Sequence, residues 1–193
     1  MSLADVRDNC MVLEFLADGF EEIEALTPVD VLRRAGVDVK TASITEHKTV
    51  TGSHGISVTA DLTLSEAEAL AENVPEMIIL PGGMPGSKNL DENPVIDRLV
   101  KKAASDGTVL AAICAAPMIL GKRGLLRGRR AACYPGFEKY LEGAVLAGGR
   151  VEEDGNFITA CGMGAALEFA LALTKRLKGE DEAARIASSV LER

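Results

Sequence analysis

Short apolar runs alternate with amphipathic stretches along the whole chain. The apolar runs are too short for ordinary helices and predict buried strands, at residues 10–16, 37–44, 76–80, 108–113, 131–134 and 156–161. Apolar residues spaced three and four apart predict helices at residues 21–35, 91–105, 165–177 and 181–191. Glycine-containing turns predict hairpins at residues 50–60 and around residues 152–155. This alternation predicts an α/β domain, with helices on both faces of a mostly parallel sheet.

The size of the chain suits a single domain. It has 193 residues, enough for one well-filled core. Residues 1–3 are interpreted as a cloning remnant, so we expect the domain to cover residues 4–193. Hydrophobic residues make up 47% and charged residues 26%, which is typical of a soluble globular protein. The formal net charge of −8 argues against nucleic acid or an anionic membrane as a partner.

Motifs for membranes, metals and nucleotides are missing from the sequence. It has no apolar run of membrane-spanning length and no secretory signal pattern at its start. The four cysteines, Cys10, Cys114, Cys133 and Cys161, form no CxxC pair, so we expect free thiols in a cytoplasmic protein. No zinc-ligand spacing and no glycine-rich nucleotide motif occurs. We therefore expect no metal and no cofactor.

Cys114 directly follows the strand predicted at residues 108–113, within the segment AAICAAP. A strand that turns straight into a helix strains the corner residue and leaves room only for small neighbours, as in a nucleophile elbow. Such a corner also places the sulfur at a helix start, where free amides favour the thiolate. The same pattern fits a small side chain buried in the core. These residues alone leave both interpretations open.

Two glycines follow the strand predicted at residues 76–80. Ligands of open parallel sheets bind beyond the carboxyl ends of the strands, where Gly82, Gly83 and Cys114 all fall. Glycines there let backbone amides approach a ligand closely, and the Gly83 and Ala115 amides together would form an oxyanion hole. An ordinary turn is the alternative.

Three glutamates open the first predicted helix. Glu21 and Glu22 are interpreted as complements of the helix dipole. Glu24 lies further in, where the helix begins to pack. A partly buried carboxyl beside a thiolate would have a raised pKa and could hold a proton near neutral pH.

Four segments, in this order, resemble the ThiJ/PfpI family, the superfamily of the Parkinson-disease-associated deglycase. They are ADGFEEIEALTPVDVLRRAGVDV, MIILPGGMPGSKNL, AAICAAPMIL and FITACGMGAALEFALAL. The resemblance implies a flavodoxin-like three-layer sandwich and a homodimer. It implies that Cys114 is the nucleophile, Glu24 its carboxylic-acid partner, and Gly83 and Ala115 the oxyanion-binding residues. Ala115 stands where protease-like members have histidine, which favours the deglycase and redox-chaperone branch.

The sequence also departs from the family pattern. Tyr134 stands where the best-known members have a histidine before a proline, and a phenol is a weaker base at neutral pH. His54 replaces an arginine of the dimer-side pocket in some relatives, whereas Arg34 is retained. The resemblance thus gives a set of pocket residues: Gly82, Tyr134, His54, Arg34 and Glu21. Gly162-Met163-Gly164 replaces Gly-Pro-Gly.

Two functions are consistent with this site. One is a cofactor-independent hydrolase or lyase of the glyoxalase III or deglycase type, acting on reactive dicarbonyls such as methylglyoxal or on their glycated adducts. The alternative is an oxidative-stress sensor or redox chaperone in which Cys114 oxidises. An older family name also suggests a metabolic role such as thiamine synthesis. The missing histidine favours the sensor hypothesis or slow catalysis. Cys133 and Cys161 are candidate resolving thiols for an oxidised Cys114.

Overall fold

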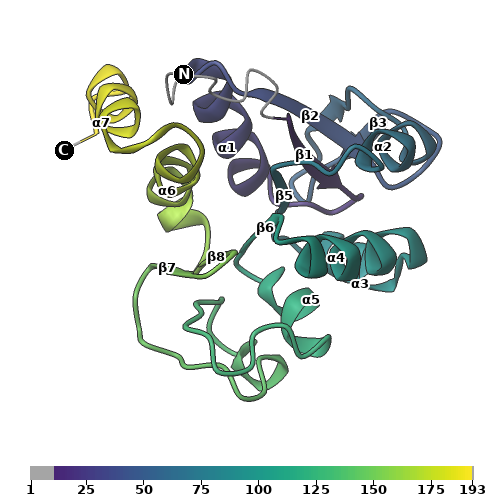
Figure 1. The fold of residues 1–193 in the computed structure, drawn as a ribbon. Coiled ribbons are helices and arrows are strands. Elements are labelled where there is room, and N and C mark those ends of the chain that lie inside the picture. The colour runs from purple at the N-terminus through teal and green to yellow at the C-terminus, as the bar shows by residue number, and fades with distance from the viewer. Residues whose placement is uncertain (1–10, 193) are drawn as a thin grey trace, which may run out of the picture.

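The computed structural model describes residues 11–192, and in it six strands form one sheet (Figure 1). The strand order is β2-β1-β5-β6-β8-β7, and every neighbouring pair is parallel except β7 with β8. The strands are β1 (Met11–Leu16), β2 (Asp38–Ser43), β5 (Met77–Leu80), β6 (Val109–Ile113), β7 (Val151–Asp154) and β8 (Phe157–Ala160). A separate hairpin joins β3 (Thr49–Thr51) to β4 (Ser57–Thr59). The predicted mostly parallel sheet is confirmed.

Helices cover both faces of the sheet. One face carries α1 (Glu22–Arg34), α6 (Ala166–Lys178) and α7 (Glu180–Ser189). The other carries α2 (Leu64–Ala71), α3 (Gly86–Glu92), α4 (Pro94–Asp106) and α5 (Pro117–Lys122). Two short 3-10 helices lie at Glu138–Tyr140 and Met163–Ala165. Across residues 11–192, no helix combines the length and the apolar character needed to cross a bilayer.

Three expectations change in the structure. The helix predicted at residues 91–105 is two helices, because the Asn93 side chain accepts from the Val95 amide and starts α4 anew. Residues 131–134 form no strand, because their amides donate to the Val145 carbonyl, to Thr159 Oγ1 and to the Cys114 carbonyl rather than to a neighbouring strand. Helix α2 was not predicted, although Thr63 and Glu66 form a capping box at its start. Cys10 and residues 4–9 lie outside the described residues.

The topology brings three distant loops together at one edge of the sheet. The chain runs from β1 outward to β2 and later returns to β5 on the opposite side of β1. Such a reversal opens a crevice at the carboxyl ends of the strands. The Glu21 amide donates to the Gly82 carbonyl at 3.0 Å, and the Gly86 amide to the Gly19 carbonyl at 3.1 Å. Beside them, at the end of β6, lies Cys114.

A buried carboxyl interrupts the apolar pattern of β1. The neighbours of Glu14 along the strand, Leu13 and Phe15, are fully buried apolar residues, and Glu14 itself is 0% exposed. Neither of its carboxylate oxygens has a hydrogen-bond partner among the described residues. Burial therefore raises the pKa of Glu14 well above its ordinary value, although the charge of Arg33 partly opposes this.

We predict that Glu14→Leu stabilises the protein, and more strongly at higher pH. Because the folded-state pKa lies above the unfolded one, Glu14 costs little below about pH 4 and more as the pH rises. The expected gain at pH 8 is about 1–3 kcal/mol in the free energy of unfolding. Denaturant titrations between pH 4 and pH 9 measure it. Glu72→Leu, at an exposed glutamate, is the control, and equal pH slopes for wild type and Glu14→Leu would contradict the prediction.

Candidate active site

Cys114 occupies a strained corner between β6 and α5. Its φ of +65° lies in the left-handed region, which non-glycine residues rarely adopt. Hydrogen bonds hold the corner on both sides. The Cys114 amide donates to the Ala160 carbonyl at 2.9 Å, and the Cys114 carbonyl accepts from the Tyr134 amide at 2.8 Å. The strained corner predicted from the small neighbouring residues is therefore present, and β8 and the segment after Cys133 fix it.

The Glu24 carboxyl lies against the Cys114 thiol. Glu24 comes from the first turn of α1 and is 1% exposed. The thiol of Cys114 and the backbone amides of Gly82 and Met163 approach its carboxylate. Its Oε2 atom nevertheless has no hydrogen bond of ordinary geometry within residues 11–192. If this oxygen carries a proton, the resulting hydroxyl group can donate a hydrogen bond to the Cys114 sulfur.

Burial and mutual repulsion raise the pKa of both members of this pair. Burial raises the pKa of Glu24 to about 7. Burial, together with the negative charge of Glu24, raises the pKa of the Cys114 thiol to about 12. The Ala115 amide acts in the direction expected for a helix start, but burial and the neighbouring carboxylate outweigh it. The sulfur gains negative charge most easily while Glu24 keeps its proton.

Two backbone amides face the sulfur. The amides of Ala115 and Gly83 both act to lower the pKa of the Cys114 thiol. Gly83 has a φ of +90°, and a Cβ there would lie 2.3 Å from the Glu21 amide nitrogen. Only glycine therefore allows the loop after β5 to come this close. The predicted oxyanion residues lie where amides could meet charge on the sulfur or on a carbonyl bound to it.

Gly82 makes room for the contact between Glu24 and Cys114. A Cβ on Gly82 would lie 2.1 Å from Glu24 Oε2 and 2.6 Å from Cys114 Cβ. The space that this glycine leaves empty is therefore filled by the two reactive side chains. The sequence suggested a pocket position for Gly82, but not that its missing side chain makes room for Glu24 and Cys114.

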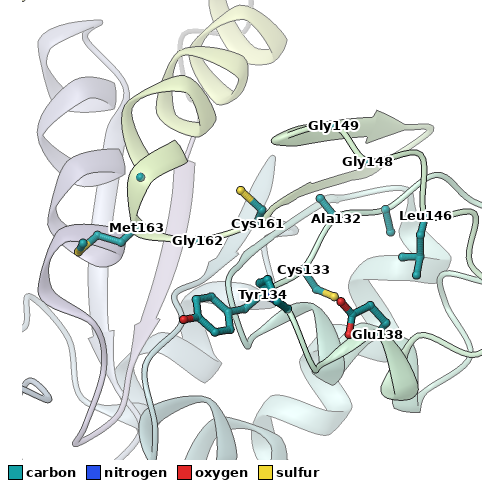
Figure 2. Close-up of a pocket in the computed structure, with 13 residues that line it drawn as sticks. Ala132, Cys133, Tyr134, Glu138, Leu146, Gly148, Gly149, Cys161, Gly162 and Met163 are labelled. Atoms are coloured by element: carbon teal, nitrogen blue, oxygen red, sulfur yellow. The ribbon is translucent and has the colours of Figure 1, made fainter.

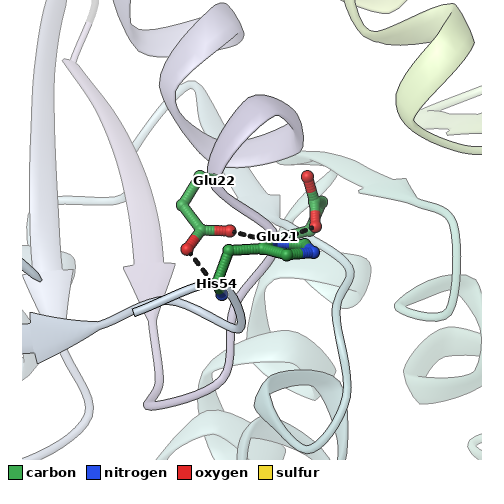
Figure 3. A group of neighbouring side chains, drawn as sticks. All are labelled: Glu21, Glu22 and His54. Atoms are coloured by element: carbon green, nitrogen blue, oxygen red, sulfur yellow. Dashed lines mark hydrogen bonds and ion pairs between the residues drawn. The ribbon is translucent and has the colours of Figure 1, made fainter. Parts of the chain in front are cut away.

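His54 pairs with two glutamates at the start of α1. Its Nδ1 lies 2.8 Å from Glu22 Oε2 and 3.4 Å from Glu21 Oε2 (Figure 3). Although burial opposes it, hydrogen bonds from His54 and from backbone amides lower the pKa of Glu22 to about 2. Glu22 and Glu21 in turn raise the pKa of His54.

These three side chains have the spacing of a metal site, with ligand atoms within 4.8 Å of one another. The Glu22 oxygens, however, already accept from the His54 amide at 2.8 Å and from its ring. These hydrogen bonds explain why the three side chains lie close together, because they hold the β3–β4 hairpin against the start of α1. We assign no metal to it.

The remaining predicted pocket residues lie at different distances from the sulfur. Arg34 lies in the last turn of α1 and pairs with Asp30 at 2.7 Å. It is about 15 Å along the helix from Glu24, so the chain does not bring it to Cys114. Tyr134 is near the site, because its amide holds the Cys114 carbonyl and its half-exposed ring contacts Gly162.

Gly162 and Met163 are site residues that the sequence did not reveal. A Cβ on Gly162 would lie 3.9 Å from Cys114 Sγ and 3.3 Å from Tyr134 Cδ2. Its φ of +153° also favours glycine. The Met163 amide approaches Glu24. In the sequence they were noted only as part of the Gly-Met-Gly segment, and nothing in the sequence placed that segment near Cys114.

The described cysteines differ in their surroundings. Cys114, Cys133 and Cys161 are all free thiols. Burial and the charge of Glu138 raise the pKa of Cys133 to about 11, which makes it a poor thiolate. Neither Cys133 nor Cys161 contacts Glu24 or the amides that face Cys114.

Comparisons with known proteins show which proteins this chain resembles. The DJ-1/PfpI family model matches residues 11–176. Protein DJ-1 homolog A of Arabidopsis thaliana is 40% identical over 183 residues, which cover 93% of this chain and 46% of the plant protein. The chain thus spans about half the length of that relative. A deglycase of Pyrococcus horikoshii is 36% identical over 152 residues, covering 77% of this chain and 88% of the archaeal protein.

A solved structure agrees with these matches. Oxidised DJ-1 of Toxoplasma gondii superposes with a TM-score of 0.87 and 35% identity, covering 94% of this chain and 98% of that one. The chain belongs to the DJ-1/PfpI family. Its fold is the flavodoxin-like sandwich that the sequence motifs implied.

We predict that Gly82→Ala disrupts the contact between Glu24 and Cys114. The new methyl group overlaps both side chains, so the glutamate must move, at a cost of about 1–3 kcal/mol in the free energy of unfolding. Without the adjacent carboxylate the Cys114 thiol becomes more acidic, and the pH midpoint of its alkylation by iodoacetamide falls. Gly164→Ala is the matched control, since a Cβ there meets no atom within 4 Å. An unchanged alkylation midpoint in Gly82→Ala would count against the contact.

Proposed function

We propose that the protein is a cofactor-independent enzyme of the glyoxalase III or deglycase type. The observation that carries this proposal is the strained Cys114 thiol in contact with Glu24, whose pKa of about 7 suits proton transfer near neutral pH. The amides of Gly83 and Ala115 face the same sulfur. Nucleophile, proton carrier and oxyanion donors thus lie around one point. Membership of a family that includes a deglycase supports the proposal.

The reaction on methylglyoxal follows from these positions. The Cys114 sulfur adds to the aldehyde carbon, and the carbonyl oxygen takes up a proton to give a hemithioacetal. The Gly83 and Ala115 amides stabilise the oxygen while it is negative. Glu24 removes the proton from the aldehyde carbon and returns one to the neighbouring carbon, which leaves a thioester. Water then cleaves the carbon–sulfur bond, releasing lactate and restoring the thiol.

The same steps apply to an adduct of methylglyoxal on an amine or thiol. In that case the bond between the aldehyde carbon and the amine or thiol must break as the carbon–sulfur bond to Cys114 forms. Tyr134 stands in the position of the expected histidine, and a phenol is a weaker base than imidazole at neutral pH, so proton transfer depends on Glu24. We therefore propose slow turnover.

We predict lactate formation from methylglyoxal that depends on Cys114 and Glu24. Cys114→Ser abolishes turnover, because the hydroxyl is a far weaker nucleophile. Glu24→Gln lowers kcat about 100-fold or more, since an amide cannot relay the proton. Tyr134→His raises kcat if the missing imidazole limits the rate. Lactate is measured with a chiral enzymatic assay, and turnover retained in Cys114→Ser would overturn the enzymatic proposal.

The alternative proposal is an oxidative-stress sensor or redox chaperone. The enclosed sulfur surrounded by amides and a protonated carboxyl favours it, because these groups would stabilise a sulfinate. Intact-protein mass spectrometry after mild peroxide treatment, followed by peptide mapping, separates the two functions. Oxygen added at Cys114 without cysteine-dependent turnover supports the sensor. Oxygen added only at Cys133 or Cys161 overturns it.

We also propose a homodimer. Ile23 and Leu26 on α1 and Ile56 in the hairpin expose much of their apolar surface, at 48%, 38% and 56%. The Ile56 amide approaches the Glu22 carboxylate, so the hairpin and the start of α1 form one face. A continuous apolar face of this kind marks a protein interface.

We predict that Ile56→Lys converts a dimer into a monomer, because an unpaired charge within an apolar interface is costly to bury. Size-exclusion chromatography with light scattering gives the mass. Val74→Lys places the same charge at a comparably exposed apolar residue on another surface and leaves the dimer intact. A monomeric wild type at micromolar concentration would contradict the proposal.

A further inference from the structure

A cavity of about 570 Å³ lies beside the candidate active site. It is open to solvent and lined by residues 131–135, 138, 146, 148, 149 and 161–164 (Figure 2). In the figure Tyr134 and Met163 lie on one side of it and Leu146 on the other. The volume falls within the range of small-molecule sites, about 300–1,000 Å³. A three-carbon dicarbonyl bound at Cys114 would leave nearly all of this space empty.

The cavity adjoins the reactive sulfur at Gly162. This residue lines the cavity, and its missing side chain would point to within 3.9 Å of Cys114 Sγ. Tyr134 also borders both places, because its amide holds the Cys114 carbonyl and its ring lines the cavity. A substrate whose aldehyde carbon meets the sulfur can therefore extend past Gly162 into the cavity without crossing a side chain at position 162.

The lining defines the chemistry of the group that fits. It consists mainly of apolar side chains and glycines, with Ala132, Leu146 and Met163 among them. Glu138 is its one charged residue, and its Oε2 accepts from the Gly136 amide at 2.7 Å. No lysine, arginine or histidine lines the cavity within the described residues. A neutral apolar group is favoured, and a carboxylate is disfavoured by Glu138.

We propose that this cavity binds the apolar substituent of the carbonyl substrate, so that aryl and branched-alkyl 2-oxoaldehydes are preferred over methylglyoxal. The inference rests on the proposed function for its chemistry. With phenylglyoxal, the Cys114 sulfur adds to the aldehyde carbon and Glu24 transfers the proton as before. Water then releases mandelate, so the atoms balance as they do for lactate. The phenyl ring would occupy the cavity throughout.

The test compares the ratio of kcat/KM for phenylglyoxal to that for methylglyoxal. In the wild type this ratio is expected to be about ten or more, since burial of even one methylene group changes selectivity about 10–200-fold. Leu146→Trp fills the cavity from its outer wall, where the leucine is half exposed, and should lower the ratio at least about tenfold through KM. Leu191→Trp, at a leucine 84% exposed near the chain end, is the matched control and leaves the ratio unchanged.

A binding measurement separates failure of this inference from failure of the proposed function. Acetophenone carries the aryl ketone but no aldehyde, and saturation-transfer NMR reports its binding without any reaction. The cavity assignment alone is overturned if methylglyoxal turnover depends on Cys114 but the ratio of the two kcat/KM values is near one. It is also overturned if Leu146→Trp leaves that ratio unchanged. If neither dicarbonyl reacts, the enzymatic proposal fails. In that case acetophenone binding that Leu146→Trp weakens supports the cavity assignment, and absence of binding overturns it. Circular dichroism confirms folding, and Leu146→Phe serves if the tryptophan variant does not fold.

Discussion

The contact between the buried Glu24 carboxyl and the Cys114 thiol is the interaction on which this site depends. Two acidic groups taken out of water cannot both ionise, because each desolvated charge is costly and the two repel each other. With pKa values of about 7 for Glu24 and about 12 for Cys114, both groups hold a proton below neutral pH, and above it Glu24 is the one that ionises. The same coupling disfavours a free thiolate next to an ionised Glu24. The reactivity of Cys114 is thus controlled by the position of a proton.

The fold holds this pair together with elements far apart in sequence. Glu24 comes from α1, Cys114 from the end of β6, and Gly82 from the loop after β5. Parallel strands place all three at one edge of the sheet, and the absence of a Cβ at Gly82 sets how closely they approach. Glu14 shows the opposite case on the same sheet. It is a buried carboxyl with no hydrogen-bond partner among the described residues, and burial alone raises its pKa.

The sequence predicted the arrangement of the sheet more completely than it predicted the pKa values in the site. Runs such as residues 76–80 and 108–113 are apolar on both faces, so they could only be central strands. Residues 131–134 are also mostly apolar, but their amides donate to the Val145 carbonyl, to Thr159 Oγ1 and to the Cys114 carbonyl, and these tertiary contacts cannot be seen in the sequence. The position of Glu24 followed from helical spacing and family motifs, whereas the direction in which the Cys114 pKa shifts did not. That direction depends on the depth of burial and on the distance to Glu24, which one-dimensional patterns do not contain. The pairing of His54 with Glu22 was hidden for the same reason.

The proposed chemistry and the proposed selectivity lie in different parts of this chain. The candidate reacting groups stand on α1 and on the loops after β5 and β6, where close packing leaves little freedom for change. The adjoining cavity is lined by residues 131–135, 138, 146, 148, 149 and 161–164, which are largely irregular and include the Ala132 amide that donates to Thr159 Oγ1. Substitutions there can alter the shape of the cavity without disturbing the pair at the sheet edge. Tyr134 belongs to both parts, since its backbone fixes the elbow and its side chain lines the cavity. A tyrosine in place of the expected histidine therefore has two effects. It changes the cavity surface that a substrate contacts, and it removes an imidazole base. The two effects must be separated before the missing imidazole is taken to mean slower catalysis.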